Sequence, residues 1–326
     1  MSQSLRGQLR ALAGQDVGRT AFDAPLSQHS SWRIGGAAWL LLEPESREQV
    51  ARVQRFVREQ KIPLVVIGRG TNLLFDDAGV HGVVMKIGEQ MGGIRISGQK
   101  IVAGGGAWVP QLARLSMRAG LTGLEHTIGI PGTLGGLVMM NGGSQHKGIG
   151  ENVTRVSIVD AEGATCQLSR EDCAFSYRHS ALQGSGSVVV EVELCCPKGE
   201  LVRVRSEMIS DLRTRRRKFP RKQPNCGSVF LSTAEMHASV GPPGKIIEDA
   251  GLKGSRIGQA EVSQQHANFI VNLGGASSAD VLALIRHIRQ KVRERIGFEL
   301  DCEVCYVGTD GMLLPAHIKA DKQLQQ

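Results

Sequence analysis

The stretch Gly129-Ile130-Pro131-Gly132-Thr133-Leu134-Gly135-Gly136, followed shortly by Gly142 and Gly143, is the most informative part of this chain. Glycine loses more conformational freedom on folding than any other residue, so a folded chain concentrates it where the main chain turns sharply or approaches a ligand closely. We therefore expect this loop to present unshielded N–H groups to an anion. Since the chain holds 41 glycines, tight turns in a β-rich domain are the alternative.

A second glycine loop, Gly68-Arg69-Gly70-Thr71-Asn72, follows the apolar, strand-like residues 64–67. Two such loops beside strands favour a large anionic ligand, such as a phosphate-bearing cofactor. Neither Gly-x-Gly-x-x-Gly nor Gly-x-x-x-x-Gly-Lys-Ser/Thr occurs in the chain. If a dinucleotide binds here, a different fold must bind it.

Length and composition predict an ordinary globular protein of two or three domains. The chain has 326 residues, of which 41% are hydrophobic and 21% charged. It contains no apolar run long enough for a transmembrane helix, and its first residues lack the apolar core of a signal peptide. We therefore expect a cytoplasmic protein.

Seven cysteines, an odd number, fit a reducing compartment better than a disulfide framework. Cys302 and Cys305 form a Cys-x-x-Cys, but no second pair accompanies them, so we expect no metal site. The formal charge is +8, and the densest basic run is 213–218. Aromatic residues are only 4% of the chain, which favours a solvated helix end or a wall for a phosphorylated substrate over a nucleic-acid surface.

Hydrophobic periodicity predicts strands alternating with helices over the first two-thirds of the chain. We expect a helix at 46–60, capped by Ser46. The other expected elements are strands at 64–67, 80–87, 101–103, 153–160, 188–194 and 298–307, and helices at 108–119 and 278–296. In the last strand apolar and acidic residues alternate, so that Glu303 shares a face with Glu299 and Asp301.

Seven motifs in order resemble one family. They are Ser30-Ser-Trp-Arg-Ile-Gly-Gly36; Gly68-Arg-Gly-Thr-Asn-Leu-Leu74; Gly123-Leu-Glu125 leading into Gly129-Ile-Pro-Gly-Thr133; Tyr177-Arg178; Gly227-Ser-Val-Phe230; Ala250-Gly-Leu-Lys-Gly254; and His266-Ala-Asn-Phe-Ile-Val-Asn272. In this order and spacing they resemble the UDP-N-acetylenolpyruvoylglucosamine reductases, flavoenzymes of peptidoglycan synthesis. The resemblance covers residues 20–308.

The resemblance implies an α+β protein with a two-subdomain FAD-binding fold of the vanillyl-alcohol-oxidase / p-cresol-methylhydroxylase type and a C-terminal α+β substrate-binding domain. We expect the FAD-binding domain at 1–198, with its subdomains divided near 75–90, and the substrate-binding domain at 199–326, with a flexible tail from about 310. The implied cofactor is non-covalent FAD, with NADPH as co-substrate. NADPH reduces FAD and leaves; the flavin then delivers hydride to C3 of an enolpyruvyl ether on a UDP-sugar while a protein acid protonates C2.

Site residues follow from matching motifs. Ser228 resembles the proton donor, and Arg178 and Glu303 resemble the pair that polarises the substrate carboxylate. The residues implied to bind FAD are Arg33, Gly68, Arg69, Gly70, Thr71, Asn72, Gly129, Ile130, Pro131, Gly132, Thr133, Asn141 and Gly142. Those implied to bind the UDP-sugar are Tyr177, Lys253, Asn268 and Arg215. No metal is implied, and we expect a monomer without nucleic-acid or membrane partners.

Without the resemblance, these residues have ordinary interpretations. Ser228 is one of many serines beside a glycine, Arg178 fits a surface arginine, and Glu303 fits a solvated strand residue. Cys226, two residues before Ser228, is either a second acid or a buried structural cysteine.

Two departures and two alternative functions remain. Phe219-Pro220 and Leu231-Ser-Thr233 replace the residues usual in the family around the serine motif, and the 50 residues from Arg178 to Ser228 leave little room for a tyrosine loop that covers the substrate in longer members. An FAD-dependent oxidase or dehydrogenase of the same fold, acting on an alcohol or sugar, is one alternative. A non-catalytic binding protein that uses the basic residues 213–222 is the other.

Overall fold

The computed structural model describes residues 2–322, and the side chains of residues 4–322. Contacts divide the chain into two compact units, the first with residues up to 22, 39–69 and 82–215, and the second with residues 23–38, 70–81 and from 216 onward. The last crossing between the units lies after Arg215, near the end of helix α5 (Leu201–Lys218). The reason is packing, because α5 buries Val204 and Met208 in a core of the first unit.

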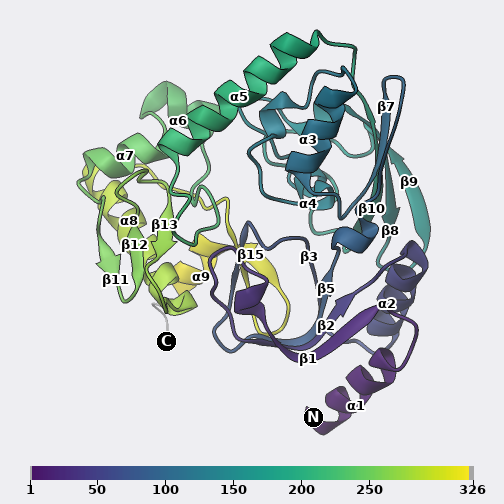
Figure 1. The fold of residues 1–326 in the computed structure, drawn as a ribbon. Coiled ribbons are helices and arrows are strands. Elements are labelled where there is room, and N and C mark those ends of the chain that lie inside the picture. The colour runs from purple at the N-terminus through teal and green to yellow at the C-terminus, as the bar shows by residue number, and fades with distance from the viewer. Residues whose placement is uncertain (1, 323–326) are drawn as a thin grey trace. The chain divides into compact units, whose positions relative to one another are not determined.

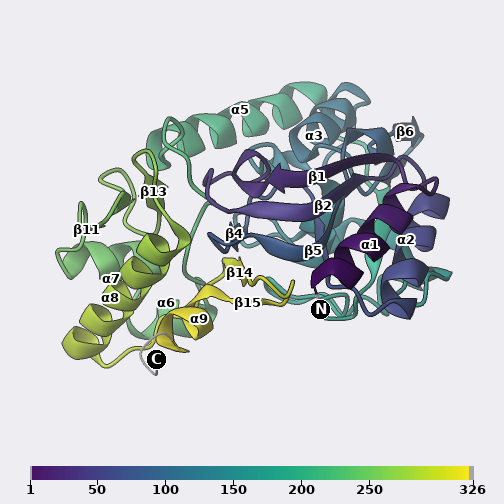
Figure 2. The ribbon, with the colours of Figure 1, turned by 90° about the horizontal axis from the view of Figure 1, so that it is seen from below.

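A four-stranded sheet, most of it in the first unit, has the order β1 (Arg19–Pro25), β2 (Ala37–Glu43), β5 (Val80–Lys86), β3 (Leu64–Ile67). Strands β3 and β5 are parallel. Helices α1 (Ser2–Ala13) and α2 (Arg47–Glu59) lie together beside this sheet and share a hydrophobic core with it (Figure 2). Ser46 Oγ accepts the Gln49 N–H at 3.2 Å, which confirms the predicted cap of α2.

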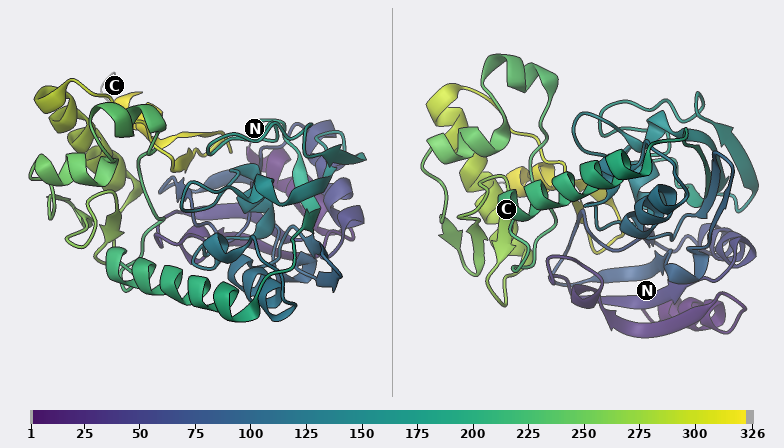
Figure 3. Two further views of the ribbon diagram at one scale, coloured as in Figure 1. Left: turned by 90° about the horizontal axis from the view of Figure 1, so that it is seen from above. Right: turned by 45° about the horizontal axis from the view of Figure 1, so that its top comes forward.

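The first unit also contains a five-stranded antiparallel sheet. Its order is β6 (Ile94–Ser97), β7 (Lys100–Gly104), β10 (Val188–Cys195), β8 (Val153–Val159), β9 (Thr165–Ser169). Helices α3 (Val109–Arg118) and α4 (Leu134–Met139) pack on it, and the long helix α5, prominent in Figure 3, contributes to the same core. The glycine loop 129–133 connects the 3₁₀ turn Glu125–Thr127 to helix α4, which begins directly after it.

The second unit contains two three-stranded sheets. One is β11 (Arg256–Ile257), β12 (Ala260–Val262), β13 (Ile270–Asn272), and the other is β15 (Leu313–Pro315), β14 (Cys305–Val307), β4 (Leu73–Phe75). Its helices are α6 (Ala234–Ser239), α7 (Pro243–Asp249), α8 (Ser278–Ile296) and α9 (Ala316–Lys322). Helix α8 lies beside β11 and β12, as Figure 1 shows. Short 3₁₀ turns complete the chain: Leu26–Gln28, Glu89–Met91, Glu125–Thr127 and Ile149–Glu151.

Helix α8 has the bounds that the sequence predicts. Ser277 caps its N-terminus, and Gly297 ends it in the left-handed conformation with φ 67°. The apolar stripe of the helix is buried from Val281 to Val292, whereas Ile296 at the last turn is 40% exposed.

The prediction of one strand over residues 298–307 is wrong, because the observed strand is much shorter. Only Cys305–Val307 forms a regular strand, which pairs in parallel with β4 and antiparallel with β15. Residues 301–303 pair instead with residues 229–231, and this change of partner interrupts the ladder. The expected alternation is still present, since Leu300, Cys302 and Val304 are buried.

Residues 313–322, which we assigned to a flexible tail, form β15 and α9 instead. Ala316 and Ala320 of α9 are fully buried in the core of the second unit. Residues 323–326 lie outside the described part of the chain.

Candidate active site

The two glycine loops meet within the first unit, where Gly68 lies against Thr133. A Cβ at Gly68 would overlap Thr133 Oγ1. Thr133 is 4% exposed and caps α4 with that oxygen. Both loops were expected to bind one phosphate-bearing cofactor, and this contact brings Gly68 of one loop against Thr133 of the other. The residues present therefore fit an FAD cradle.

The second half of loop 68–72 belongs to the second unit and is held closely there. Gly70 has φ +59°, and a Cβ on it would overlap the main-chain oxygen of His29. Ser31 N–H donates to Gly70 O at 3.0 Å. The neighbouring segment is fixed by Trp32, which is fully buried and donates Nε1–H to Ile270 O at 2.7 Å. Arg33, expected to contact FAD, is exposed and has φ 58°.

Tyr177 and Arg178 form the tip of a tight turn in the first unit. Ser176 and His179 exchange two main-chain hydrogen bonds of 3.1 Å across it. Arg178 has φ 54°, a left-handed conformation that side chains rarely adopt. Its guanidinium lies 5.1 Å from the centre of the Tyr177 ring, and Nη2–H donates to Gly143 O at 3.1 Å.

The loop after α4 is tied to this turn. Asn141 Nδ2–H donates to Ser176 O at 2.8 Å, and Asn141 Oδ1 accepts the Gly150 N–H at 2.9 Å. Asn141, predicted to bind FAD, thus also links the glycine-rich loop to the turn that carries Arg178. Its contact with FAD stays a prediction.

Ser228 and Glu303 come together in the second unit. Glu303 N–H donates to Val229 O at 2.8 Å, so Glu303 lies beside the residue that follows Ser228. Asn72 Nδ2–H donates to Glu303 O at 3.1 Å, and Cys305 N–H donates to Asn72 O at 3.1 Å. The parallel pairing of β4 with β14 produces this contact, because its register places Leu73, the residue after Asn72, opposite Cys305, two residues after Glu303. Both Ser228 and Glu303 are half-buried.

Asn268 holds the serine segment from the other side. It is 4% exposed, accepts the Phe230 N–H at Oδ1 and donates Nδ2–H to Phe230 O, both at 2.9 Å. The structure therefore gives Asn268 a positioning contact, and its expected contact with substrate stays a prediction.

The two predicted cations of the substrate site belong to different units. In the first unit, the Arg215 side chain packs against Gly129. Burial lowers the pKa of its guanidinium, and the nearby Asp211 carboxylate raises that pKa in part. In the second unit, Lys253 forms an ion pair of 2.6 Å with Glu248 and is 27% exposed.

Cys226 is a structural residue. It is 4% exposed, and its thiol contacts Gly70 O and Leu73 O at 3.5 and 3.4 Å. Burial raises its pKa to about 12. Of the two interpretations of Cys226, the structure favours the buried cysteine.

His126 is a residue that the sequence did not single out. It is 2% exposed, its carbonyl accepts Ser144 Oγ–H at 2.6 Å, and its Nδ1 accepts the Ser144 N–H at 3.4 Å. Burial lowers its pKa to about 4, so it is neutral near pH 7. It therefore anchors the loop whose Gly143 carbonyl accepts from Arg178. A lone histidine carries no sequence signal for such a contact.

Two family models match this chain. The FAD binding domain matches residues 39–169, and the C-terminal domain of UDP-N-acetylenolpyruvoylglucosamine reductase matches residues 219–307. Within residues 2–322, no helix is both long and apolar enough to cross a membrane.

Similar proteins agree with these matches. UDP-N-acetylenolpyruvoylglucosamine reductase 1 of Corynebacterium glutamicum is 48% identical over 94% of this chain and 91% of its own length. The reductase of Heliobacterium modesticaldum is 43% identical over 88% of this chain and 90% of its own length. The crystal structure of the reductase from Thermus caldophilus has a TM-score of 0.74 and 31% identity, covering 88% of this chain and 98% of that one. The expected α+β fold, an FAD-binding domain followed by a family-specific C-terminal domain, is confirmed. This chain belongs to the UDP-N-acetylenolpyruvoylglucosamine reductase family.

Proposed function

We propose that this chain catalyses the FAD-dependent, NADPH-driven reduction of the enolpyruvyl ether of UDP-N-acetylglucosamine to UDP-N-acetylmuramate, a peptidoglycan precursor. Family membership supports this proposal. The structural observation that carries it is the main-chain network from Asn72 through Glu303 to Val229. That network holds a carboxylate, a residue of the flavin loop and the segment of Ser228 side by side.

The glycine loops are the part of the chain that would hold the cofactor. We assign the FAD pyrophosphate to Gly68 and Arg69 together with Gly129–Thr133 in the first unit, and to Gly70–Asn72 in the second. When bound, FAD accepts hydride from NADPH and supplies it to the substrate. The contact between Gly68 and Thr133 leaves no room for side chains and supports the assignment.

Ser228 would supply the proton. Adding hydride to C3 of the enolpyruvyl group leaves negative charge at C2, beside the carboxylate. The Ser228 hydroxyl gives its proton to C2 and regains one from solvent, to which a half-buried serine has access. Because the serine segment is bonded on both sides, to Glu303 and to Asn268, its geometry is fixed before substrate arrives.

Arg178 and Glu303 would act on the developing charge. The Arg178 guanidinium attracts the substrate carboxylate, and Glu303 fixes the orientation of the reacting group. Preorganised charges of this kind act most strongly where water is excluded. The left-handed conformation of Arg178 supports this assignment, because strained main chain clusters at functional sites.

Binding of the UDP-sugar is assigned to Tyr177, Arg215, Lys253 and Asn268. Arg215 and Lys253 carry the positive charge that a diphosphate requires. We further propose that residues 1–198 form the FAD-binding domain, which also contributes Tyr177 and Arg178 to the substrate site, and that residues 199–326 form the substrate-binding domain. We also propose that the enzyme acts as a cytoplasmic monomer without nucleic-acid or membrane partners. Sedimentation of the holoenzyme tests the monomer.

Stopped-flow spectroscopy of the purified yellow protein tests the reaction. We expect NADPH to bleach the flavin absorbance and the enolpyruvyl substrate to restore it, with oxygen restoring it far more slowly. Rapid re-oxidation by oxygen with poor reduction by NADPH would instead indicate an oxidase of the same fold. A colourless protein with salt-sensitive affinity for nucleic acid would indicate a basic binding protein.

A further inference from the structure

The segment beyond residue 307, where the match to the reductase C-terminal domain ends, packs against β14, the strand that follows Glu303. Strand β15 pairs antiparallel with β14, and Ala316 N–H donates to Val304 O at 3.0 Å. Helix α9 then buries Ala316 and Ala320 in the core of the second unit. These contacts place the side chains of α9 next to residues 299–303.

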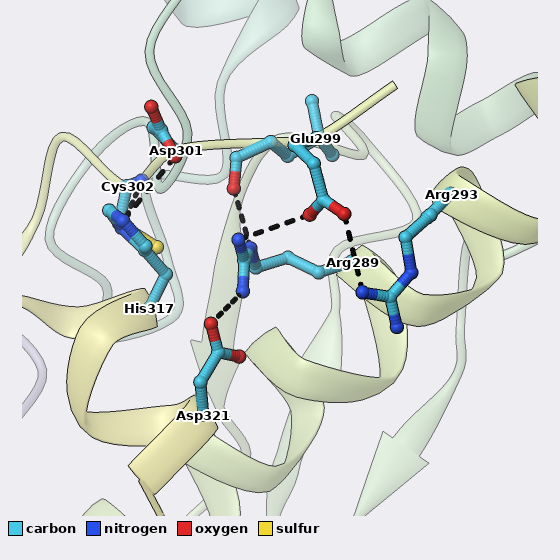
Figure 4. Close-up of polar contacts among 8 residues, drawn as sticks. Arg289, Arg293, Glu299, Asp301, Cys302, His317 and Asp321 are labelled. Atoms are coloured by element: carbon cyan, nitrogen blue, oxygen red, sulfur yellow. Dashed lines mark hydrogen bonds and ion pairs between the residues drawn. The ribbon is translucent and has the colours of Figure 1, made fainter. Parts of the chain in front are cut away.

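His317 of α9 accepts a main-chain hydrogen bond from the residue before Glu303. Cys302 N–H donates to His317 Nδ1 at 2.9 Å. On the other side of the ring, Nε2 lies 3.3 Å from Asp301 Oδ1. Figure 4 shows the His317 ring between these two groups. Since Nδ1 is an acceptor here, the neutral ring carries its proton on Nε2, directed at Asp301.

Arg289 of α8 fixes the same segment from the other end. Its Nε–H donates to Leu300 O at 2.7 Å, and its guanidinium pairs with Glu299 at 3.2 Å and with Asp321 of α9 (Figure 4). The Arg289 side chain is only 12% exposed, although its partners Glu299 and Asp321 are 49% and 48% exposed. The ion pair with Asp321 therefore ties α9 to α8 next to His317.

Every residue from 300 to 303 is thus anchored through its main chain. Leu300 O is bonded to Arg289 and Asp301 O accepts the Leu231 N–H at 2.9 Å. Cys302 N–H is bonded to His317. Glu303 N–H is bonded to Val229. Among these four contacts, only the one at Cys302 uses a side chain as the acceptor, and that side chain is His317. Cys302 directly precedes Glu303, so this contact fixes the main chain where it enters Glu303.

We propose that His317 is a positioning residue for Glu303, acting through the Cys302 N–H. This inference rests on the proposed role of Glu303 in the reaction. The neutral imidazole holds residue 302, which fixes the direction of the Glu303 carboxylate relative to the serine segment. A displacement of about 1 Å at a reacting group can cost on the order of 100-fold in rate.

Protonation of His317 would release this contact, because a protonated Nδ1 cannot accept. Four charged groups face the ring: Asp301 before Cys302, Arg289 on α8, Asp321 on α9, and Glu299. Burial lowers the pKa of His317; Asp301, Asp321 and Glu299 raise it, and Arg289 lowers it. Positioning is therefore complete above the pKa of the unfolded histidine and is lost as pH falls through the lower, folded value.

Three variants test the proposal in double-mixing stopped-flow on FAD-loaded enzyme. His317→Ala should leave reduction by NADPH within about twofold of wild type and slow re-oxidation by the enolpyruvyl substrate about 10- to 100-fold. His317→Asn, whose Oδ1 can replace Nδ1 as acceptor, should recover most of that loss. Lys322→Ala, an exposed change on the same helix, should match wild type in both steps. A His317→Ala enzyme that is re-oxidised at the wild-type rate would overturn the proposal.

Glu303→Gln separates this proposal from the proposed function. If Glu303→Gln is re-oxidised normally, the assigned role of Glu303 fails; if it is slow while His317→Ala is normal, only the positioning role fails. Should His317→Ala not fold, Asp301→Asn replaces it, since it removes a charge that raises the pKa of His317 and keeps the side-chain oxygen. The pH below which the re-oxidation rate falls should then shift to a lower value. A pH that does not shift contradicts the proposal.

Discussion

Replacing Gly70 by alanine should cost the protein both stability and flavin. Gly70 has φ +59°, a left-handed conformation that costs an L-residue about 1–2 kcal/mol. In addition, the new Cβ would overlap His29 O and lie 3.0 Å from His29 C. These are main-chain atoms, which cannot rotate away, so we add about 1–3 kcal/mol for overpacking. The expected loss in the free energy of unfolding is therefore about 2–5 kcal/mol.

Gly297 provides a matched control in the same unit. It has a similar φ of +67°, but a Cβ there would meet nothing within 4 Å. Gly297→Ala should lose only the conformational term, about 1–2 kcal/mol. Urea unfolding measures both losses, and the flavin absorbance of the purified variants measures FAD occupancy. We expect Gly70→Ala to lose FAD and Gly297→Ala to keep it. Equal losses of stability with full occupancy in both variants would refute the close approach at Gly70.

Three further predictions follow from side-chain environments. Arg178→Gly should lower the free energy of unfolding by at most about 1 kcal/mol, because glycine readily adopts the φ of 54° at this position. It should nevertheless block re-oxidation of the flavin by substrate as fully as Arg178→Ala does. Urea unfolding measures the first effect and stopped-flow the second, and normal re-oxidation would contradict the role of Arg178. Lys253→Ala should raise the substrate KM at least tenfold, as expected for loss of a charge-assisted bond to a diphosphate, with flavin reduction unchanged; steady-state kinetics show this, and an unchanged KM removes Lys253 from the site. Cys226, whose pKa burial raises to about 12, should not react with a thiol reagent in the folded protein, whereas the exposed Cys195 should; mass spectrometry after labelling at pH 8 distinguishes them, and rapid labelling of Cys226 contradicts its burial.

Regular elements with strong periodicity were predictable from the sequence. Helix α8 has the predicted bounds because its stripe and both ends are encoded locally, in Ser277 and Gly297. The strand at 298–307 was overextended because alternation reports burial and not hydrogen-bond partners. Residues 301–303 and 305–307 alternate alike but pair with different parts of the chain.

Site residues were predictable only where motifs could be matched to a family. Periodicity alone places Glu303 on a solvated face with Glu299 and Asp301, and nothing local indicates that Asn72, 231 residues away, bonds to its carbonyl. His126 and His317 went unnoticed for the same reason, since each acts by accepting a main-chain N–H from a distant residue. Such contacts depend on tertiary structure and leave no pattern in the sequence.

The half-reactions of Ser228→Ala test the central claim most directly. Ser228 is proposed to act only after NADPH has reduced the flavin, so the variant should bind FAD and be bleached by NADPH at close to the wild-type rate. Re-oxidation by the enolpyruvyl substrate should fall by about 10²–10⁴-fold, the usual contribution of a positioned proton donor. Ser228→Cys should recover part of this rate, because a thiol also donates a proton. Re-oxidation of Ser228→Ala at close to the wild-type rate would show that the proton comes from another group and would contradict the account.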